Sequence, residues 1–567
     1  MEKILSTRVW KMVIGVLPFS LFSLLPLSTQ AQSWVKKAAK SVFTLKTFDA
    51  QGTLLSSGNG VFVGEAGEAI SSFAPFKGAS SAVVIDAAGK EYPVEVLLGA
   101  NDTYDVAKFR IGGLKKSQPL AMASTKPVVG STVSLLPYRE TKTATSGLLR
   151  KAETFGSGYD YYTVRMQMPQ DGVGLPLLDA DGQLLGLMQQ PASAADTLCY
   201  AVSALFADSL KMTGLSINDP SLRATHIKKA LPAELSQAQL TLFVASSTLD
   251  SAAYAQLVDD FIQQFPNVQD GYISRAQFAA GADRYADADR DMEQALKVSE
   301  AKDEVHYSYS RLIYQKALYR PEPAYEPWTL DRALQEAVAA YDANPMPAYR
   351  QQQAYVLYAQ KKYAEASSVY ETIVASSLRS PELFFEASRC KLAQNDTVGY
   401  LALLDSAVNM FSRPLLKEAA PYLLARAQAR LDAGKYRDAT NDLNDYEQLM
   451  AAQVNDQFYY LRFQAEQGGR LFQQALNDIA KAIQMNPQQE VYYAEKASLE
   501  VRVGLYDDAI QTAQECIRLV PEYSDGHLFL GLAQCLKGNK TEGIKSLQRA
   551  KELGDEQADG LIEKYGK

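Results

Sequence analysis

The stretch Asp171-Gly-Val-Gly-Leu-Pro-Leu-Leu-Asp-Ala-Asp-Gly-Gln-Leu-Leu-Gly-Leu187 contains two apolar runs separated by the turn signal Asp181-Gly182. Short apolar runs between turn residues are typical of β-strands. Similar runs recur between Ser41 and about Val202, at residues 41–47, 60–63, 82–85, 94–98 and 133–136. Many short strands at this spacing predict an all-β barrel or sandwich.

Several segments of this β-rich region follow the order of a known family. Asn59-Gly-Val-Phe-Val63 and the segment Ala69 to Ala79 resemble the strand and histidine loop of the high-temperature-requirement branch of trypsin-fold serine proteases. The family's remaining segments are matched in order by residues 91–96, 99–111, 130–133, 145–148, 171–187 and 200–203. The resemblance covers about residues 35–213. It implies two six-stranded barrels with the site in the cleft between them.

The residues at the family's catalytic positions are altered. By this resemblance Ala74 replaces the histidine, Asp105 keeps the aspartate and Val173 replaces the serine. A Ser-His-Asp mechanism needs a hydroxyl to attack and an imidazole to take its proton. No histidine precedes His226 in the chain. We therefore expect a pseudoprotease, in which the fold is kept and the chemistry is lost.

Two further departures surround the position of the missing serine. Asp171 stands where the family has a glycine whose backbone N–H helps to form the oxyanion hole, and Leu175 replaces a second loop glycine. A carboxylate at the first position would repel a developing oxyanion. We interpret Asp105 as a turn residue that binds backbone N–H groups; the alternative is that it belongs to a repurposed site.

Other hydroxyl groups are candidates for a rearranged mechanism: Ser71, Ser72, Thr145 and Ser146. A serine nucleophile needs an adjacent base and a third group that orients the base. Without histidine a lysine would have to serve, and no Ser-x-x-Lys motif stands in the cleft segments. A serine endopeptidase with rearranged catalytic residues is the enzymatic alternative.

From about Tyr254 the chain repeats with a period near 34 residues. An aromatic residue precedes an alanine by three positions in Tyr285–Ala288, Tyr363–Ala366, Tyr436–Ala439, Phe472–Ala475 and Tyr506–Ala509, and prolines recur at 266, 345, 487 and 521. This pattern is similar to the tetratricopeptide repeat, a helix-turn-helix unit. Proline ends each second helix because it cannot continue the hydrogen-bond ladder.

Small residues at fixed positions predict how each pair of helices packs. In the first helices they are Ala276, Ala354, Ala427, Ala497 and Gly531; in the second helices they are Ala288, Ala366, Ala439, Ala475 and Ala509. We expect a linker at 214–235 and an all-α tetratricopeptide-repeat superhelix over 236–567. It should hold about eight repeats between 269 and 555 and a capping helix near 557–565.

The concave face of such an array commonly takes a peptide or a partner's helix. The insertion Tyr319-Arg-Pro-Glu-Pro-Ala-Tyr-Glu-Pro-Trp328 is either a surface excursion or a binding element on one rim. Most tyrosines of the array fall at packing positions. No basic residues stand in the arrangement that clamps a C-terminal carboxylate.

The N-terminus has the pattern of a targeting segment. Lys3, Arg8 and Lys11 precede an apolar stretch from Met12 to Leu27. Small residues before Ala31 offer a cleavage site, so we predict a signal peptide over 1–31. No later segment could span a bilayer. The mature protein is expected in the bacterial periplasm or outside the cell.

Composition excludes several function classes. With 57 Lys and Arg against 65 Asp and Glu the formal net charge is -8, which argues against a general nucleic-acid binder. Scattered histidines at 226, 306 and 527 make no zinc site, and no cofactor is predicted. Cys199, Cys390, Cys516 and Cys535 are expected to be buried free thiols, although Cys516 and Cys535 could meet.

The leading hypothesis is an exported, non-catalytic scaffold that binds peptides or partner proteins through both parts of the chain. A second hypothesis is the rearranged serine endopeptidase. A third is a regulator of an active protease, in which the inactive cleft binds extended peptides by strand addition. The sequence names neither the partner nor the oligomeric state.

Overall fold

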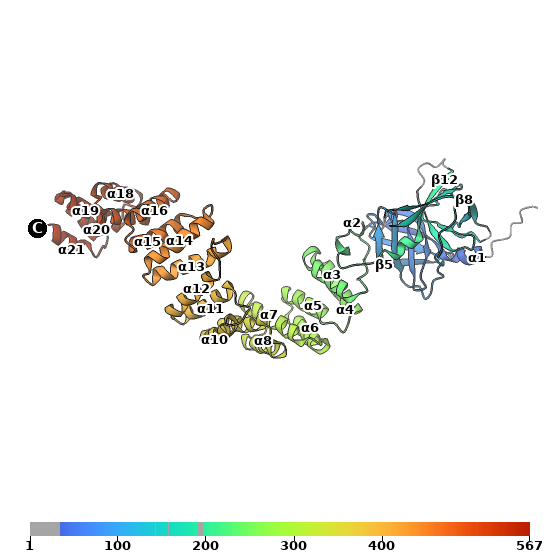
Figure 1. Ribbon diagram of the computed structural model, residues 1–567, viewed down its shortest axis with the longest axis horizontal. Helices are drawn as coiled ribbons and strands as arrows, with labels where there is room; N and C mark the ends of the chain where they lie inside the picture. Colours follow the sequence, from blue (N-terminus) through green and yellow to red (C-terminus); the bar gives the residue numbers. More distant parts are fainter. Residues whose placement is uncertain (1–33, 142, 157, 191–196, 567) are drawn as a thin grey trace, which may run out of the picture. The chain divides into compact units, whose positions relative to one another are not determined.

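The computed structural model describes residues 34–566 except 142, 157 and 191–196. The signal peptide expected at 1–31 lies outside the described residues. Contacts divide the chain into two compact units, one that ends at Pro266 and one over Asn267–Lys567. Figure 1 shows the strands of the first unit and the paired helices of the second.

Six antiparallel strands form the first barrel, in the order β1-β2-β3-β6-β5-β4. Phe43, Leu45, Phe62 and Phe109 fill its interior and are almost completely inaccessible to solvent. Side chains alternate between the interior and the outside because successive residues of a strand point to opposite faces. The strands are β1 (Val42–Phe48), β2 (Leu54–Phe62), β3 (Glu68–Ser71), β4 (Ser81–Ile85), β5 (Glu91–Asn101) and β6 (Val106–Ile111).

A second closed barrel has the order β10-β11-β12-β9-β8-β7. Its strands are β7 (Thr132–Leu135), β8 (Thr145–Phe155), β9 (Tyr159–Arg165), β10 (Pro176–Leu178), β11 (Leu184–Met188) and β12 (Leu198–Ser203). The turn between β10 and β11 is closed by Asp179, whose carboxylate accepts the N–H groups of Asp181 at 2.9 Å and Gln183 at 2.8 Å. The two six-stranded barrels expected from the sequence are thus confirmed.

Part of the first barrel packs into the apolar core of the second. Val61, Ile70 and Val106 of the first barrel lie in the same buried cluster as Leu177 and Leu187 of the second. This cluster continues the interior of the second barrel across the interface between the two. The barrels therefore form one body, and the segments that face the interface have fixed positions.

The segment after the second barrel packs back on the first one. The N–H of Leu97 donates to the carbonyl of Lys228 at 2.8 Å, and the N–H of Ala230 donates to the carbonyl of Leu97 at 2.9 Å. Three helices follow the barrels in the first unit: α2 (Pro220–Arg223), α3 (Leu235–Thr248) and α4 (Ser251–Gln264). The boundary between the compact units therefore falls after Pro266, whereas the sequence places a linker at 214–235.

The second unit is an all-helical repeat region. Residues 267–566, all of them described, hold eight helix pairs and a final helix, α21 (Ala558–Tyr565). The first four pairs are α5 (Gln269–Gly281) with α6 (Tyr285–Val298), α7 (Lys302–Tyr319) with α8 (Leu330–Ala343), α9 (Pro347–Ala359) with α10 (Tyr363–Val374), and α11 (Pro381–Ala393) with α12 (Thr397–Asn409). The last four are α13 (Ala420–Asp432) with α14 (Tyr436–Met450), α15 (Asp456–Gly468) with α16 (Phe472–Met485), α17 (Glu490–Arg502) with α18 (Tyr506–Leu519), and α19 (Ser524–Lys537) with α20 (Lys540–Glu552).

Small residues lie where the helices of a pair cross. The alanines of the second helices, at 288, 366, 439, 475 and 509, are all inaccessible to solvent. In the last pair a β-carbon on Gly531 would lie 2.7 Å from both the carbonyl oxygen of Gly543 and Cγ of Leu547. Real β-carbons do not approach other atoms so closely, so these two helices pack with glycine against glycine.

All four cysteines are buried and none forms a disulfide, as expected from the sequence. Burial raises the pKa of the Cys390 thiol to about 11 and that of the Cys516 thiol to about 12. The Cys516 thiol donates to the carbonyl of Glu490 at 3.4 Å. These thiols act as small apolar side chains of the core.

Substituting Gly531→Ala should weaken the α19–α20 pair. The added methyl group must displace backbone atoms of α20, and overpacking of this kind costs about 1–3 kcal/mol. Hydrogen exchange measured by mass spectrometry over residues 524–552 should show faster exchange in the variant. The matched control is Gly560→Ala in α21, where a β-carbon meets nothing within 4 Å. The control should leave exchange over 524–552 unchanged; equal effects of the two variants would contradict the packing argument.

Candidate functional site

Ala74 and Asp105, two of the three positions singled out by the sequence, lie side by side. Ala74 begins the short 3-10 helix Ala74–Phe76 after β3, and Asp105 lies in the turn between β5 and β6 with φ of +50°. The carboxylate of Asp105 accepts the backbone N–H of Ala74 at 2.7 Å. Burial raises the pKa of Asp105, against the opposing effects of the N–H groups of Ala74 and Phe73 and the charge of Lys77.

The loop that carries Val173 is fixed to the first barrel by Asn59 of β2. The Asn59 side-chain amide donates to the carbonyl of Asp171 at 2.6 Å and to that of Val173 at 3.2 Å. On its other side the loop is bonded to β11, because the N–H of Gly174 donates to the carbonyl of Met188 at 2.8 Å. Asp171 itself is exposed, whereas Leu175 is buried.

Asn59 also joins this loop to the segment before Ala74. Its backbone carbonyl accepts the hydroxyl of Ser71 at 2.7 Å, and Ser71 pairs with Gly60 in the ladder between β2 and β3. Asn59 therefore connects the loop of Val173 with the strand that leads to Ala74, and Ala74 is bonded to Asp105. The side chains at the three positions are a methyl group, a carboxylate bonded to the backbone, and an isopropyl group.

The other hydroxyl groups considered from the sequence have structural surroundings in the two barrels. Ser71 is fully buried, and its proton is donated to the Asn59 carbonyl. Ser72 is buried beside it. Thr145 and Ser146 belong to β8 of the second barrel, where they pair with Leu135 and Ser134 of β7.

The three imidazoles of the chain have other surroundings. His226 lies in the segment bonded to the first barrel, with its backbone N–H donated to the carbonyl of Ala79 at 2.8 Å. Nδ1 of His306 lies 2.5 Å from the carboxylate of Glu336, and Nε2 of His527 lies 2.9 Å from the carbonyl of Pro521. The Asp105 carboxylate accordingly binds backbone N–H groups instead of an imidazole.

Sequence reasoning missed the role of Asn59, although a signal was present. A buried carboxamide among apolar strand residues needs hydrogen-bond partners, so Asn59 between Gly58 and Gly60 marks a point where another segment approaches. The position of that segment, 112 residues further along the chain, is not visible in any local pattern.

In the second unit the insertion at 319–328 is held by the array at both ends. The ammonium group of Lys316 donates to the carbonyls of Pro321 at 2.7 Å and Pro323 at 2.9 Å. At the other end the carboxylate of Asp289 accepts the indole N–H of Trp328 at 2.8 Å and the hydroxyl of Tyr325 at 3.0 Å. Trp328 is buried while residues 320–324 are exposed, so the segment is an anchored surface loop.

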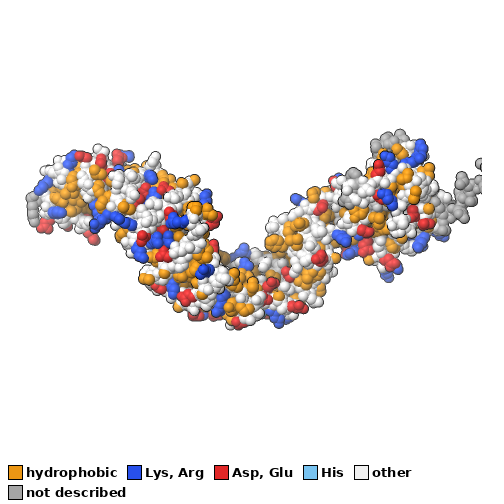
Figure 2. Space-filling view, in the orientation of Figure 1, with side chains coloured by type: hydrophobic (Ala, Val, Ile, Leu, Met, Phe, Trp, Pro, Cys, Tyr) orange, Lys and Arg blue, Asp and Glu red, His pale blue; other side chains and the backbone are white. Residues whose placement is uncertain are grey.

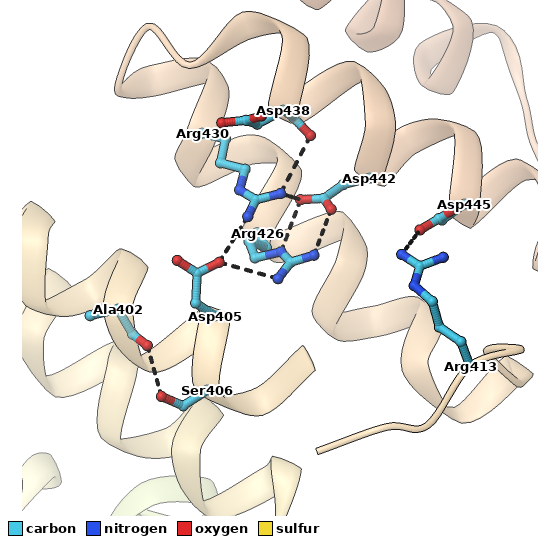
Figure 3. A network of polar contacts seen from close by, with 9 residues as sticks. All are labelled: Ala402, Asp405, Ser406, Arg413, Arg426, Arg430, Asp438, Asp442 and Asp445. Atoms are coloured by element: carbon cyan, nitrogen blue, oxygen red, sulfur yellow. Dashed lines mark hydrogen bonds and ion pairs between the residues drawn. The ribbon is translucent and has the colours of Figure 1, made fainter. Parts of the chain in front are cut away.

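Buried arginine–aspartate pairs recur between the two helices of a repeat. The two residues of each pair are 16 positions apart in the sequence: Arg275 and Asp291, Arg426 and Asp442, Arg462 and Asp478. Figure 3 shows that Arg426 and Arg430 both lie between Asp442 of α14 and Asp405 of the preceding repeat. Because these guanidinium groups are satisfied by internal carboxylates, they are structural residues of the array and not free cations for a ligand.

Aromatic side chains continue along neighbouring first helices. The rings of Tyr314 on α7 and Tyr355 on α9 are stacked with centroids 6.4 Å apart, and those of Tyr307 and Tyr349 lie 5.0 Å apart. The guanidinium of Arg311 lies over the Tyr307 ring. Tyr307, Tyr314 and Tyr355 are half-buried, so they pack the array and leave part of each ring accessible to solvent.

Comparison with known proteins assigns the first unit. Residues 58–187 match the model of the trypsin-like peptidase domain. The first unit contains a trypsin-like peptidase domain. Among solved structures the chain is similar to the active form of a protease from M. tuberculosis (21% identity, 30% of this chain, 80% of that chain, TM-score 0.27). It is also similar to a serine endoprotease from Yersinia pestis (18% identity, 31% of this chain, 63% of that chain, TM-score 0.27).

Curated relatives match shorter parts of the chain. DnaJ homolog subfamily C member 7 from Homo sapiens is 33% identical over 92 residues, which are 16% of this chain and 19% of the relative. Small glutamine-rich tetratricopeptide repeat-containing protein 2 from Saccharomyces cerevisiae is 26% identical over 95 residues, 17% of this chain and 28% of the relative. The chain thus spans less than a third of these relatives. These two matches, together with the helix pairs of the second unit, support a tetratricopeptide-repeat array fused to the trypsin-like peptidase domain.

No helix within residues 34–566, apart from the positions left undescribed, is long and apolar enough to cross a membrane.

The loop of the trypsin-like peptidase domain that carries Val173 should be intolerant of a side chain at Gly174. Gly174 has φ of +77°, and a β-carbon there would collide with the carbonyl oxygen of Asn59. Gly113 has a similar φ of +73°, but nothing lies within 4 Å of its β-carbon position. Gly113→Ala should therefore cost only the backbone strain of about 1–2 kcal/mol, and Gly174→Ala clearly more.

Denaturant unfolding of the two alanine variants, followed by hydrogen exchange over residues 176–188, measures this difference. The comparison isolates the contact with Asn59, because both variants carry the same backbone strain. Equal loss of stability in both would show that the Asn59 contact does not fix the loop.

Proposed function

We propose that the protein is an exported, non-catalytic scaffold that binds peptides or partner proteins. In this proposal the trypsin-like peptidase domain is inactive, and the tetratricopeptide-repeat array supplies the main interaction surface. The observation that carries the proposal is the hydrogen bond at 2.7 Å from the Ala74 backbone to the Asp105 carboxylate, beside a loop that bears Val173.

The chemistry of these side chains supports the proposal. Peptide hydrolysis in this family needs a hydroxyl nucleophile whose proton is taken by a base. Ala74 and Val173 provide neither, and the buried hydroxyl of Ser71 is engaged with the Asn59 carbonyl. Asp171 adds a negative charge to the loop where an oxyanion would need donors.

The array supports the binding part of the proposal. Tyr314 and Tyr355 form a stacked pair across two neighbouring first helices, with Arg311 close by on α7. Aromatic and arginine side chains are the types that carry most of the binding energy in protein interfaces. Lys and Arg are interspersed with Asp and Glu over the face drawn in Figure 2, which favours a protein partner over a nucleic acid.

Export is part of the proposal because of the N-terminal sequence. Three basic residues, an apolar stretch and small residues before Ala31 have the order of a cleaved signal peptide. The bacterial periplasm or the exterior is the proposed location.

The purified protein should not react with a fluorophosphonate probe, which modifies activated serine hydroxyls. Ser71 donates its proton to a backbone carbonyl, and Ala74 stands where the family has its imidazole, so we expect no serine of this domain to react at a useful rate. In-gel fluorescence should show no more labelling of native protein than of heat-denatured protein, with trypsin as the positive control.

Stoichiometric labelling of the native protein would contradict the proposal and support the rearranged peptidase. Ser71→Ala and Ser146→Ala variants would then locate the nucleophile, because only one of them should abolish the label.

Partner binding should depend on the first helices of the array. We expect a photo-crosslinking amino acid in place of Tyr355 on α9 to capture a partner protein in the producing cells. The same residue in place of Val398, which is 80% exposed on the second helix α12, should not. Equal capture at both positions, or capture at position 398 alone, would place the interaction surface elsewhere.

A further inference from the structure

A large cavity in the first unit lies apart from the altered catalytic positions. It is enclosed by the segment after the second barrel and by helices α3 and α4, and its volume is about 760 Å³. Ala74, Asp105 and Val173 are not among its lining residues. Its size is that of pockets that enclose small organic ligands, which are about 300–1,000 Å³.

The walls of the cavity are mainly aliphatic. Met212, Ile217, Leu222, Leu249 and Leu257 line it. Leu222 belongs to the core cluster of the first barrel, and Met212 packs against that cluster, so this side of the cavity is built on a rigid barrel. Among the described residues that line the cavity there is no Phe, Tyr or Trp.

The charged groups in the cavity are predominantly basic: Arg223, Lys228 and Lys229. Asp260 is the one carboxylate among the described lining residues. It already accepts the ammonium group of Lys228 at 2.7 Å and the side-chain amide of Gln256 at 3.1 Å. The positive charges of Arg223 and Lys229 are therefore not balanced by a carboxylate of the cavity.

Lys229 is the unusual member of this group. It is partly buried, and its ammonium group donates to the backbone carbonyl of Thr225. Burial lowers the pKa of Lys229, and no neighbouring carboxylate opposes that effect. A charged group that leaves water without a counter-ion loses solvation free energy. A bound anion at this position would recover part of that loss.

We propose that this cavity binds an amphipathic carboxylate, an aliphatic chain that ends in one carboxylate group. The carboxylate would bind Lys229 and Arg223, and the chain would lie against Met212, Leu249 and Leu257. This function is separate from the proposed scaffold role and does not depend on it. A free fatty acid and an aliphatic peptide C-terminus share this chemistry.

Isothermal titration calorimetry of the full chain with dodecanoate tests the proposal. Wild-type protein should bind dodecanoate saturably, whereas dodecylammonium, which has the same chain and the opposite charge, should not bind. Lys229→Gln should weaken binding by about tenfold or more, because a hydrogen bond to a charged group contributes about 1.5–3 kcal/mol. The matched control Lys228→Gln removes the neighbouring ammonium group that is already paired with Asp260, and should change the affinity little.

A second variant makes the test independent of charge. Ala253→Trp places a bulky side chain at an exposed position of α4 that lines the cavity, and it should abolish binding without unfolding the protein, as checked by circular dichroism. Absence of saturable dodecanoate binding would overturn the proposal if the peptide below also fails to bind. Equal losses in the Lys228 and Lys229 variants, or equal binding of dodecylammonium, would overturn it as well.

A peptide arm distinguishes the two sources of the carboxylate. The tetrapeptide Ala-Leu-Leu-Leu is titrated with a free C-terminus and as its amide. Binding of dodecanoate but not of the peptide would identify a fatty-acid site. Binding of the free peptide but not of its amide would identify a site for a peptide C-terminus, and it would sustain the proposal even without dodecanoate binding. The fluorophosphonate result bears on neither outcome.

Discussion

The hydrogen bonds from the Asn59 amide to the carbonyls of Asp171 and Val173 connect the two barrels at the point where a peptidase of this fold would act. Asn59 lies within β2, three residues before its last residue Phe62, and its carbonyl also accepts the Ser71 hydroxyl. One buried carboxamide thus sets the positions of the loop before β10 and of the segment that leads to Ala74. The hydrogen bonds of this one residue hold these two segments at fixed positions.

The Asp105 carboxylate has a structural role in this arrangement. In an active triad the aspartate orients an imidazole. Here the Asp105 carboxylate is used by backbone N–H groups of the neighbouring loop, so it still stabilises the junction between β5 and β6. A domain maintained in this way remains a rigid support. The tetratricopeptide-repeat array is built on a different principle, in which alanine or glycine at each helix crossing lets two backbones approach closely.

The sequence predicted those parts of the fold that leave a local or periodic pattern. Alternating short strands and the order of the family segments predicted both barrels, and the recurrence of Ala288, Ala366 and Ala509 in a fixed frame predicted the helix pairs. It did not predict the bonds between Leu97 and the segment 228–230, since the turn residues from Gly214 to Ser221 have the composition of a linker. Contacts between distant segments follow from the closed fold and not from neighbouring residues.

The arginine–aspartate pairs were also not predicted from the sequence, for a different reason. The interval of 16 residues between Arg426 and Asp442 repeats at Arg462 and Asp478, so the pattern was present in the sequence. The repeat frame is defined by small and aromatic residues, and these charged positions lie outside it. Removal of one partner from a buried pair leaves the other charge without compensation, so such pairs tie the two helices of a repeat to a single register.

The state of the four thiols bears on how they react. Only a thiolate attacks a disulfide, and a thiol with its pKa near 11 or 12 is almost entirely protonated at neutral pH. In the folded protein the Cys390 and Cys516 thiols should therefore exchange with disulfides only slowly.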